Sequence, residues 1–169
     1  STLPGSVVKV FAGTYVENNP IKCGPQVSIV GDSLREVTVV PQNADKDLFH
    51  VAPGDLISDM SFTGTMNAGS AVVAFDPDVI RYSGQSPYLL NCTNFISNSI
   101  GMKIDGDNVI GPFKSFVTDS FTQYNQNGIG ASITNKGYAQ IVSLFTINSD
   151  MGIFCGSGGQ CDVTNSNSS

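Results

Sequence analysis

Short apolar segments recur along the chain, and turn residues separate them. They cover residues 7–11, 27–30, 37–40, 48–51, 56–62 and 71–75, and their apolar residues alternate with polar ones or are β-branched. Runs of this length and character, bounded by Gly, Pro, Asn and Asp, are typical of strands. No long window places apolar residues at the helical positions i, i+3, i+4 and i+7. The pattern therefore predicts an all-β chain.

The second half of the chain carries a degenerate repeat. Segments 89–95, 116–121 and 140–145 are each followed by a polar stretch with Asn, then by Gly and an apolar residue. The glycines of this motif are Gly101, Gly128 and Gly152, which are 27 and 24 residues apart. One coil of a β-solenoid needs a period in the twenties, and leucine-rich repeats of similar period need more leucine. The repeat predicts a parallel β-helix of about six coils, with residues 1–169 as one domain.

Coil stacking predicts which side chains form columns along the axis of the β-helix. Consecutive coils lie about 4.8 Å apart, so inward side chains form continuous columns along the axis. The expected inward aromatic column consists of Phe95, Phe121 and Phe145. Three asparagines beside turns either bond along the axis through stacked amides or take up left-handed backbone: Asn98, Asn125 and Asn148.

Composition and charge narrow the classes of partner. Hydrophobic residues make up 40% of the chain and charged residues 13%, with a net charge of −6. An acidic surface repels phosphate backbones, so we expect no nucleic-acid partner. No apolar run approaches the roughly 18 residues of a membrane helix, so we expect no membrane partner. The chain opens at Ser1 without a Met or a signal peptide, and we expect a processed chain or a fragment of a longer protein.

The opening segments resemble a known family. Residues 8–17 read VKVFAGTYVE, and residues 27–32 and 37–40 continue with VSIVGD and VTVV. This series is similar to the first coils of pectin-lyase-like β-helices, and the later segments fit the same pattern. The resemblance implies a single-stranded right-handed parallel β-helix. Pectin esterases, polysaccharide lyases, phage tailspikes, virion proteins and adhesins share that scaffold.

The catalytic motifs of that family do not carry over to this chain. The resemblance implies that an esterase would pair aspartates with a downstream arginine, and Asp59 has none nearby. A lyase would use Arg or Lys as a base beside calcium-binding carboxylates, and the arginines here are Arg35 and Arg81. The sequence therefore points away from an enzyme.

Two acidic turns form the candidate ligand site. Segments 73–78 and 102–107 look like the same corner of consecutive coils. Stacking would bring their carboxylates together in two pairs, Asp76 with Asp105 and Asp78 with Asp107. Such a group can hold a hard cation, with calcium as the candidate, or contact a sugar, or hydrolyse a glycosidic bond. Asp-Pro and Asp-Gly are also ordinary turn formers, which is the alternative interpretation.

Three other features carry expectations of their own. Residues 76–87 interrupt the coil rhythm and are expected to form a protruding loop. His50 is expected on a strand face rather than in a catalytic group. Cys155 and Cys161 either close a small disulfide loop or remain thiols.

A β-helix rich in Asn, Ser and Thr and without enzyme motifs resembles virion proteins of this scaffold. The resemblance implies a structural virion component, a β-helix module of a phage tail, fibre or baseplate that also contacts glycans. The flat face and open end of a solenoid aggregate unless they are covered. Covering them favours a homo-oligomer, with a trimer as the expected form, or contacts with other virion proteins. The alternatives are a polysaccharide lyase or depolymerase of the same fold, and a cell-surface adhesin or carbohydrate-binding module. These would act outside the cell or at its surface, on a surface polysaccharide.

Overall fold

The computed structural model describes residues 3–80, 85–107 and 114–169, and in these ranges it contains strands and turns but no helix. The expected loop at residues 76–87 therefore lies partly outside the described residues. The strands are β1 (Val7–Val10), β2 (Gly13–Glu17), β3 (Ile21–Lys22), β4 (Ser28–Gly31), β5 (Val37–Pro41), β6 (Phe49–Val51), β7 (Leu56–Phe62), β8 (Ala71–Phe75), β9 (Tyr88–Asn94), β10 (Ile100–Asp105), β11 (Ser115–Gln123), β12 (Ile129–Thr134), β13 (Tyr138–Thr146), β14 (Met151–Cys155), β15 (Gln160–Thr164) and β16 (Asn167–Ser168).

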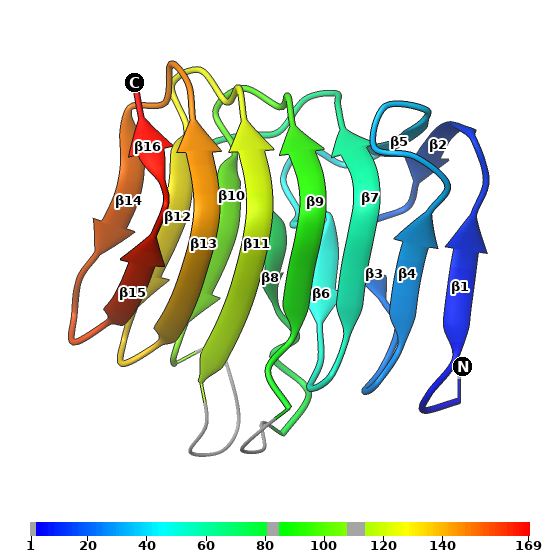
Figure 1. Cartoon of the computed structure of the whole chain (residues 1–169), viewed down its shortest axis with the longest axis horizontal. Coiled ribbons are helices and arrows are strands. Elements are labelled where there is room, and N and C mark those ends of the chain that lie inside the picture. Colours follow the sequence, from blue (N-terminus) through cyan, green and yellow to red (C-terminus); the bar gives the residue numbers. More distant parts are fainter. Residues whose placement is uncertain (1–2, 81–84, 108–113) are drawn as a thin grey trace.

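The strands form two parallel sheets that the chain visits in turn. Seven strands of a 10-stranded sheet run in the order β1-β4-β7-β9-β11-β13-β15, and its other three strands are β5, which pairs with β7, β2, which pairs with β5, and β16, which pairs with β13. A 6-stranded sheet runs β14-β12-β10-β8-β6-β3. In Figure 1 the strands of the larger sheet point upward in front, those of the smaller sheet point downward behind, and the chain advances from right to left. That sense of winding is right-handed, as for parallel crossovers in general. The fold is a right-handed parallel β-helix.

One residue in each long strand has left-handed backbone. Asp59, Asn91, Ser120 and Ser143 stand at matching positions in β7, β9, β11 and β13, with φ between 49° and 58°. The Asn91 amide donates to the Asp59 carboxylate at 2.8 Å, so this column is bonded between coils. Each such residue interrupts the in-and-out alternation, because the residues before and after it no longer fall on the faces that a regular strand gives them. In β11 both Asp119 and Ser120 are therefore on the outside.

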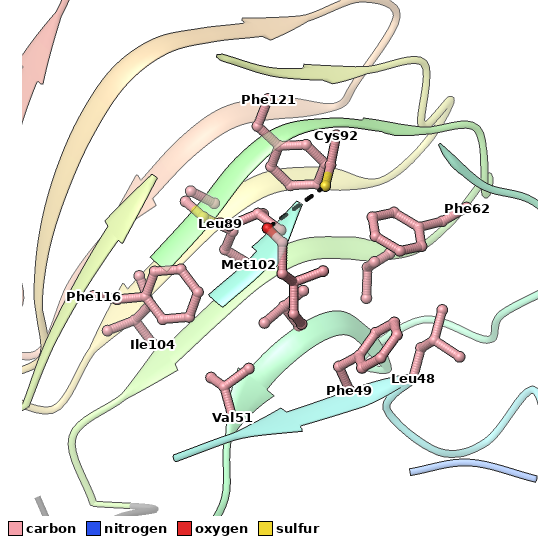
Figure 2. Close-up of a cluster of buried hydrophobic side chains, with 14 of the residues drawn as sticks. Leu48, Phe49, Val51, Phe62, Leu89, Cys92, Met102, Ile104, Phe116 and Phe121 are labelled. Carbon is pink, nitrogen blue, oxygen red and sulfur yellow. Dashed lines mark hydrogen bonds between the residues drawn. The ribbon is translucent and has the colours of Figure 1, made fainter. Parts of the chain in front are cut away.

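The core is a set of columns along the helix axis. Met60, Cys92, Phe121 and Leu144 follow one another in register through β7, β9, β11 and β13, and each is at most 2% exposed. Figure 2 shows the Phe121 ring next to Cys92, in an interior that is also filled by Phe62, Leu89, Met102 and Phe116. Closely packed apolar side chains thus replace any central channel in this part of the chain.

The predicted inward column of three phenylalanines is wrong at two positions. Phe121 is fully buried, but Phe95 and Phe145 are each 39% exposed. The reason is register, because the partners of Phe121 are Cys92 and Leu144. Phe95 instead stacks outside on Tyr124, with ring centroids 5.6 Å apart.

The predicted stack of three asparagine amides is also wrong. Asn98 and Asn148 are exposed and have left-handed backbone, with φ of 63° and 58°. This matches the alternative role of turn residues. Only Asn125 is buried, and its amide donates to the carbonyl of Ser99 in the preceding coil at 3.2 Å.

A different buried polar column joins the same coils. Asn94, Gln123 and Thr146 are in register, and none is more than 1% exposed. The Asn94 amide donates to Gln123 Oε1 at 3.3 Å, and Gln123 Nε2 donates to the carbonyl of Gly130 at 2.8 Å. Their hydrogen bonds offset the cost of burying amides in an apolar interior.

Glycine is required beside this polar column. The strand register aligns Gly101 with Gly130 and Gly152, so the true repeats are 29 and then 22 residues, and Gly128 is not part of the glycine column. A side chain at Gly101 would collide with the Gln123 amide, and one at Gly130 would collide with the carbonyl of Gly152. Close approach of backbone to buried amide leaves no room for a methyl group.

The Gly130→Ala substitution should destabilise the protein by about 2 kcal/mol, because the added methyl overpacks the site against backbone that cannot move away. Thermal unfolding followed by circular dichroism should show a Tm lowered by roughly 5 °C. Ser132→Ala on the outer side of the same strand is the matched control and should leave Tm nearly unchanged. Equal Tm values for the two variants would contradict this packing.

Candidate functional site

The two acidic turns occupy the same corner of consecutive coils. Asp76 follows β8 and Asp105 ends β10, and the pairing of Ala74 with Lys103 places the two carboxylates at matching positions. Each carboxylate closes its own turn, because the Asp78 N–H donates to Asp76 at 3.0 Å and the Asp107 N–H donates to Asp105 at 2.9 Å. Both are turns of the kind that Asp forms with the backbone two residues on.

The carboxylates have partners on opposite sides of the corner. Lys22 on β3, two coils toward the N-terminus, reaches the nearly buried Asp76 at 3.2 Å and the exposed Asp78 at 2.8 Å. Asp105 accepts a hydrogen bond from the Asn135 amide in the next coil at 2.8 Å. The hydrogen bond from Lys22 holds the pKa of the Asp78 carboxyl below its usual value. The single lysine ammonium therefore bridges both carboxylates of this turn and balances one of their two charges.

These contacts do not provide a set of ligands for the cation that the sequence suggested. Within residues 3–80, 85–107 and 114–169, no three His, Cys, Asp or Glu side chains are grouped to hold a metal ion. Asp107 is exposed, and its backbone rather than its carboxylate takes part in the turn. The direct effect of these contacts is to hold the turns of different coils together.

A second polar group on the same sheet centres on Asp47, which sequence reasoning missed. One carboxylate oxygen of Asp47 accepts from the Ala71 N–H at 2.7 Å and from Lys103 Nζ at 2.9 Å. The other oxygen lies 3.0 Å from His50 Nε2. The side chain of Asp47 is only 12% exposed, so its carboxylate is largely shielded from water. Through these contacts it links three consecutive coils. We call Asp47, His50 and Lys103 the Asp47 cluster.

Opposing effects set the charge of Asp47. Burial alone would raise the pKa of its carboxyl, but hydrogen bonds from His50, Lys103 and the Ala71 backbone lower it further than burial raises it. The net pKa is below the ordinary value of 3.8, so the carboxylate is ionised at neutral pH.

A surface hollow of about 440 Å³ opens beside the Asp47 cluster. The side chains that line it include Asp45, Lys46, Asp47, His50, Asn67 and Lys103. Its charges balance, and the Asn67 amide donates to Asp45 at 2.5 Å. The hollow can accept a small polar ligand by hydrogen bonding.

Neither ring nitrogen of His50 is open to this hollow. Its Nε2 faces the Asp47 carboxylate and so carries the proton, and its Nδ1 is buried with no hydrogen-bond partner among the described residues. A general base needs a free nitrogen within reach of the substrate. The position of His50 on β6, with its ring turned outward beside Lys22, agrees with the predicted strand-face histidine.

Comparisons with protein-family models, with curated proteins and with solved structures found no significant match. Along the described part of the chain, no helix is long and apolar enough to cross a membrane.

The Asp47→Asn substitution should lower the free energy of unfolding by about 2 kcal/mol at pH 7, because it removes the anion that Lys103 and His50 share. Chemical denaturation at several pH values measures this. The depressed pKa of Asp47 means that its contribution is present above about pH 4 and is lost as the pH falls through the folded-state value. The difference between the wild type and the variant should therefore shrink in acid.

Asp150→Asn is the matched control, since Asp150 is exposed and the same charge is removed. It should change stability by less than about 0.5 kcal/mol. A loss of the same size in both variants would mean that net charge, rather than the contacts of Asp47, sets the effect.

Proposed function

We propose that the chain is a structural component of a virion, a β-helix module of a phage tail, fibre or baseplate that assembles as a homotrimer. The observation that carries the proposal is an apolar strip on the outer face of the larger sheet. Its members point away from the core and are half-buried, apart from Tyr88, which is 36% exposed: Val30, Leu56, Tyr88, Leu90, Val117 and Val142.

The strip is unbroken over three coils, and in the neighbouring row Ser58 and Asp119 alternate with Val30, Leu90 and Val142. Leu56 of β7 is followed in register by Tyr88 of β9 and Val117 of β11. A sheet with one face in water normally carries polar residues there, and contiguous exposed apolar patches mark interaction surfaces. A rod that packs this face against copies of itself covers the strip, and the resemblance to a scaffold used by phage tailspikes supports the same assignment.

The bonding of the polar residues supports a structural role over a catalytic one. Asp76 and Asp78 share an ion pair with Lys22, and Asp47 forms an ion pair with Lys103. Groups held in such pairs stabilise a rigid rod, whereas a catalytic acid or base needs access to substrate.

The second candidate is contact with a surface polysaccharide, as an adhesin, a carbohydrate-binding module, or a lyase or depolymerase. The hollow beside the Asp47 cluster favours it, because its hydrogen-bonding side chains suit a sugar. Release of new reducing ends or ultraviolet absorbance from acidic polysaccharides, with calcium present, would establish the enzymatic form. Binding without turnover would establish the binding form.

Light scattering coupled to gel filtration tests the trimer directly. The wild type should elute with three times the mass of one chain. Leu90→Glu should shift it to the monomer mass, because a buried unpaired carboxylate opposes assembly. Ser132→Glu, which adds the same charge on the outer side of β12, should remain a trimer. A monomeric wild type would overturn the trimer proposal.

A further inference from the structure

The last coil ends in a pair of cysteines at a corner that earlier coils fill with core residues. Ile133 on β12 pairs with Cys155 on β14, and Ala139 on β13 pairs with Cys161 on β15. Ile133 and Ala139 are both fully buried in the core cluster. Cys155 and Cys161 therefore continue two inward columns and face each other across the turn between β14 and β15.

The turn between the two cysteines is short and ordered by backbone hydrogen bonds. The Gly159 N–H donates to the carbonyl of Gly156 at 2.9 Å, and the Gly156 N–H donates to the carbonyl of Ile133 in the preceding coil at 2.9 Å. The Gln160 N–H continues the ladder to the carbonyl of Gly137 at 2.9 Å. These bonds fix both strand ends, so Cys155 and Cys161 stand at the two ends of one short turn.

The pair is open to solvent on one side. No coil follows β14 and β15 in the described structure, so Cys155 is exposed, while Cys161 is half-buried against the core. Burial, and then the neighbouring Cys155, raise the pKa of the Cys161 thiol. Both groups are thiols here, as one of the two alternatives for these residues expects.

The other two cysteines differ in place and in chemistry. Burial raises the pKa of Cys92 to about 12, and this side chain is enclosed in the core. Burial raises the pKa of Cys23 to about 11, and Cys23 follows β3, at the opposite edge of the smaller sheet from β14. Thiols need to be exposed and to form the thiolate in order to react, so both are poor competitors.

We propose that Cys155 and Cys161 form a redox modification site that is converted to an intramolecular disulfide by a small disulfide such as oxidised glutathione. The thiolate of exposed Cys155 attacks the glutathione disulfide, forming a mixed disulfide and releasing one glutathione thiolate. Cys161 then loses its proton and attacks the Cys155 sulfur, which releases the second glutathione. The two protein thiols lose two electrons and two protons, and the glutathione disulfide takes them up.

The bond would hold the turn between β14 and β15. A disulfide stabilises chiefly by restricting the unfolded chain, and a short loop gives a modest gain. The site does not depend on the proposed assembly or on the proposed function.

Oxidised glutathione applied to the purified reduced chain, followed by alkylation and mass spectrometry of peptides, tests the proposal. The expected product is one peptide that has lost two hydrogens, with Cys155 and Cys161 linked and no glutathione retained. The reaction should be faster at alkaline pH, because it needs thiolates. The oxidised protein should have a Tm higher by roughly 5 °C. Thiols that stay fully alkylatable, or glutathione that stays attached to Cys155, would overturn the proposal.

Single substitutions test whether Cys155 and Cys161, rather than the other two cysteines, form the disulfide. Cys161→Ser should stop the reaction at a stable glutathione adduct on Cys155, and Cys155→Ser should leave Cys161 alkylatable. Cys23→Ser should form the same disulfide as the wild type. Cys155→Ser and Cys161→Ser should keep the circular dichroism of the wild type, because neither side chain is fully buried. A disulfide to Cys23 or Cys92 in any variant would contradict the assigned pair.

Discussion

In-register parallel pairing between coils is the constraint on which the rest of the structure depends. Each inner strand of the larger sheet, such as β9 or β11, is hydrogen-bonded to one coil before it and one after it. A single coil cannot bury its own apolar face, so the chain gains a core only when coils stack. Stacking then repeats every side-chain environment along the axis (Figure 1). The apolar columns, the buried amides and the outer polar contacts all follow from this repetition.

The strand character and the period of the chain predicted this architecture well. Alternating apolar runs and a repeat in the twenties are properties of each coil alone, and they can be read without knowing which residues pair. The detailed register could not be read, because one left-handed residue per long strand shifts the alternation and coil lengths vary from 21 to 32 residues. Because of the unequal coil lengths, the partners of the buried Phe121 are Cys92 and Leu144, while Phe95 and Phe145 are on the outside.

The candidate site could likewise be predicted only in part from the sequence. The shared corner of Asp76 and Asp105 could be anticipated, since both follow apolar runs of similar sequence. Their partners could not, because Lys22 and Asn135 reach them from other coils. The Asp47 cluster could not be predicted from the sequence for the same reason. Lys103 lies 56 residues from Asp47 in sequence, and only coil stacking brings the two together.

The measurement that tests the stacking most directly is the pattern of nuclear Overhauser effects from the Phe121 ring. The ring protons should show contacts to the side chains of Cys92 and Leu144, which lie in the coils before and after. Contacts to Phe95 or Phe145 instead, or contacts between antiparallel strands, would contradict the register and with it the β-helix.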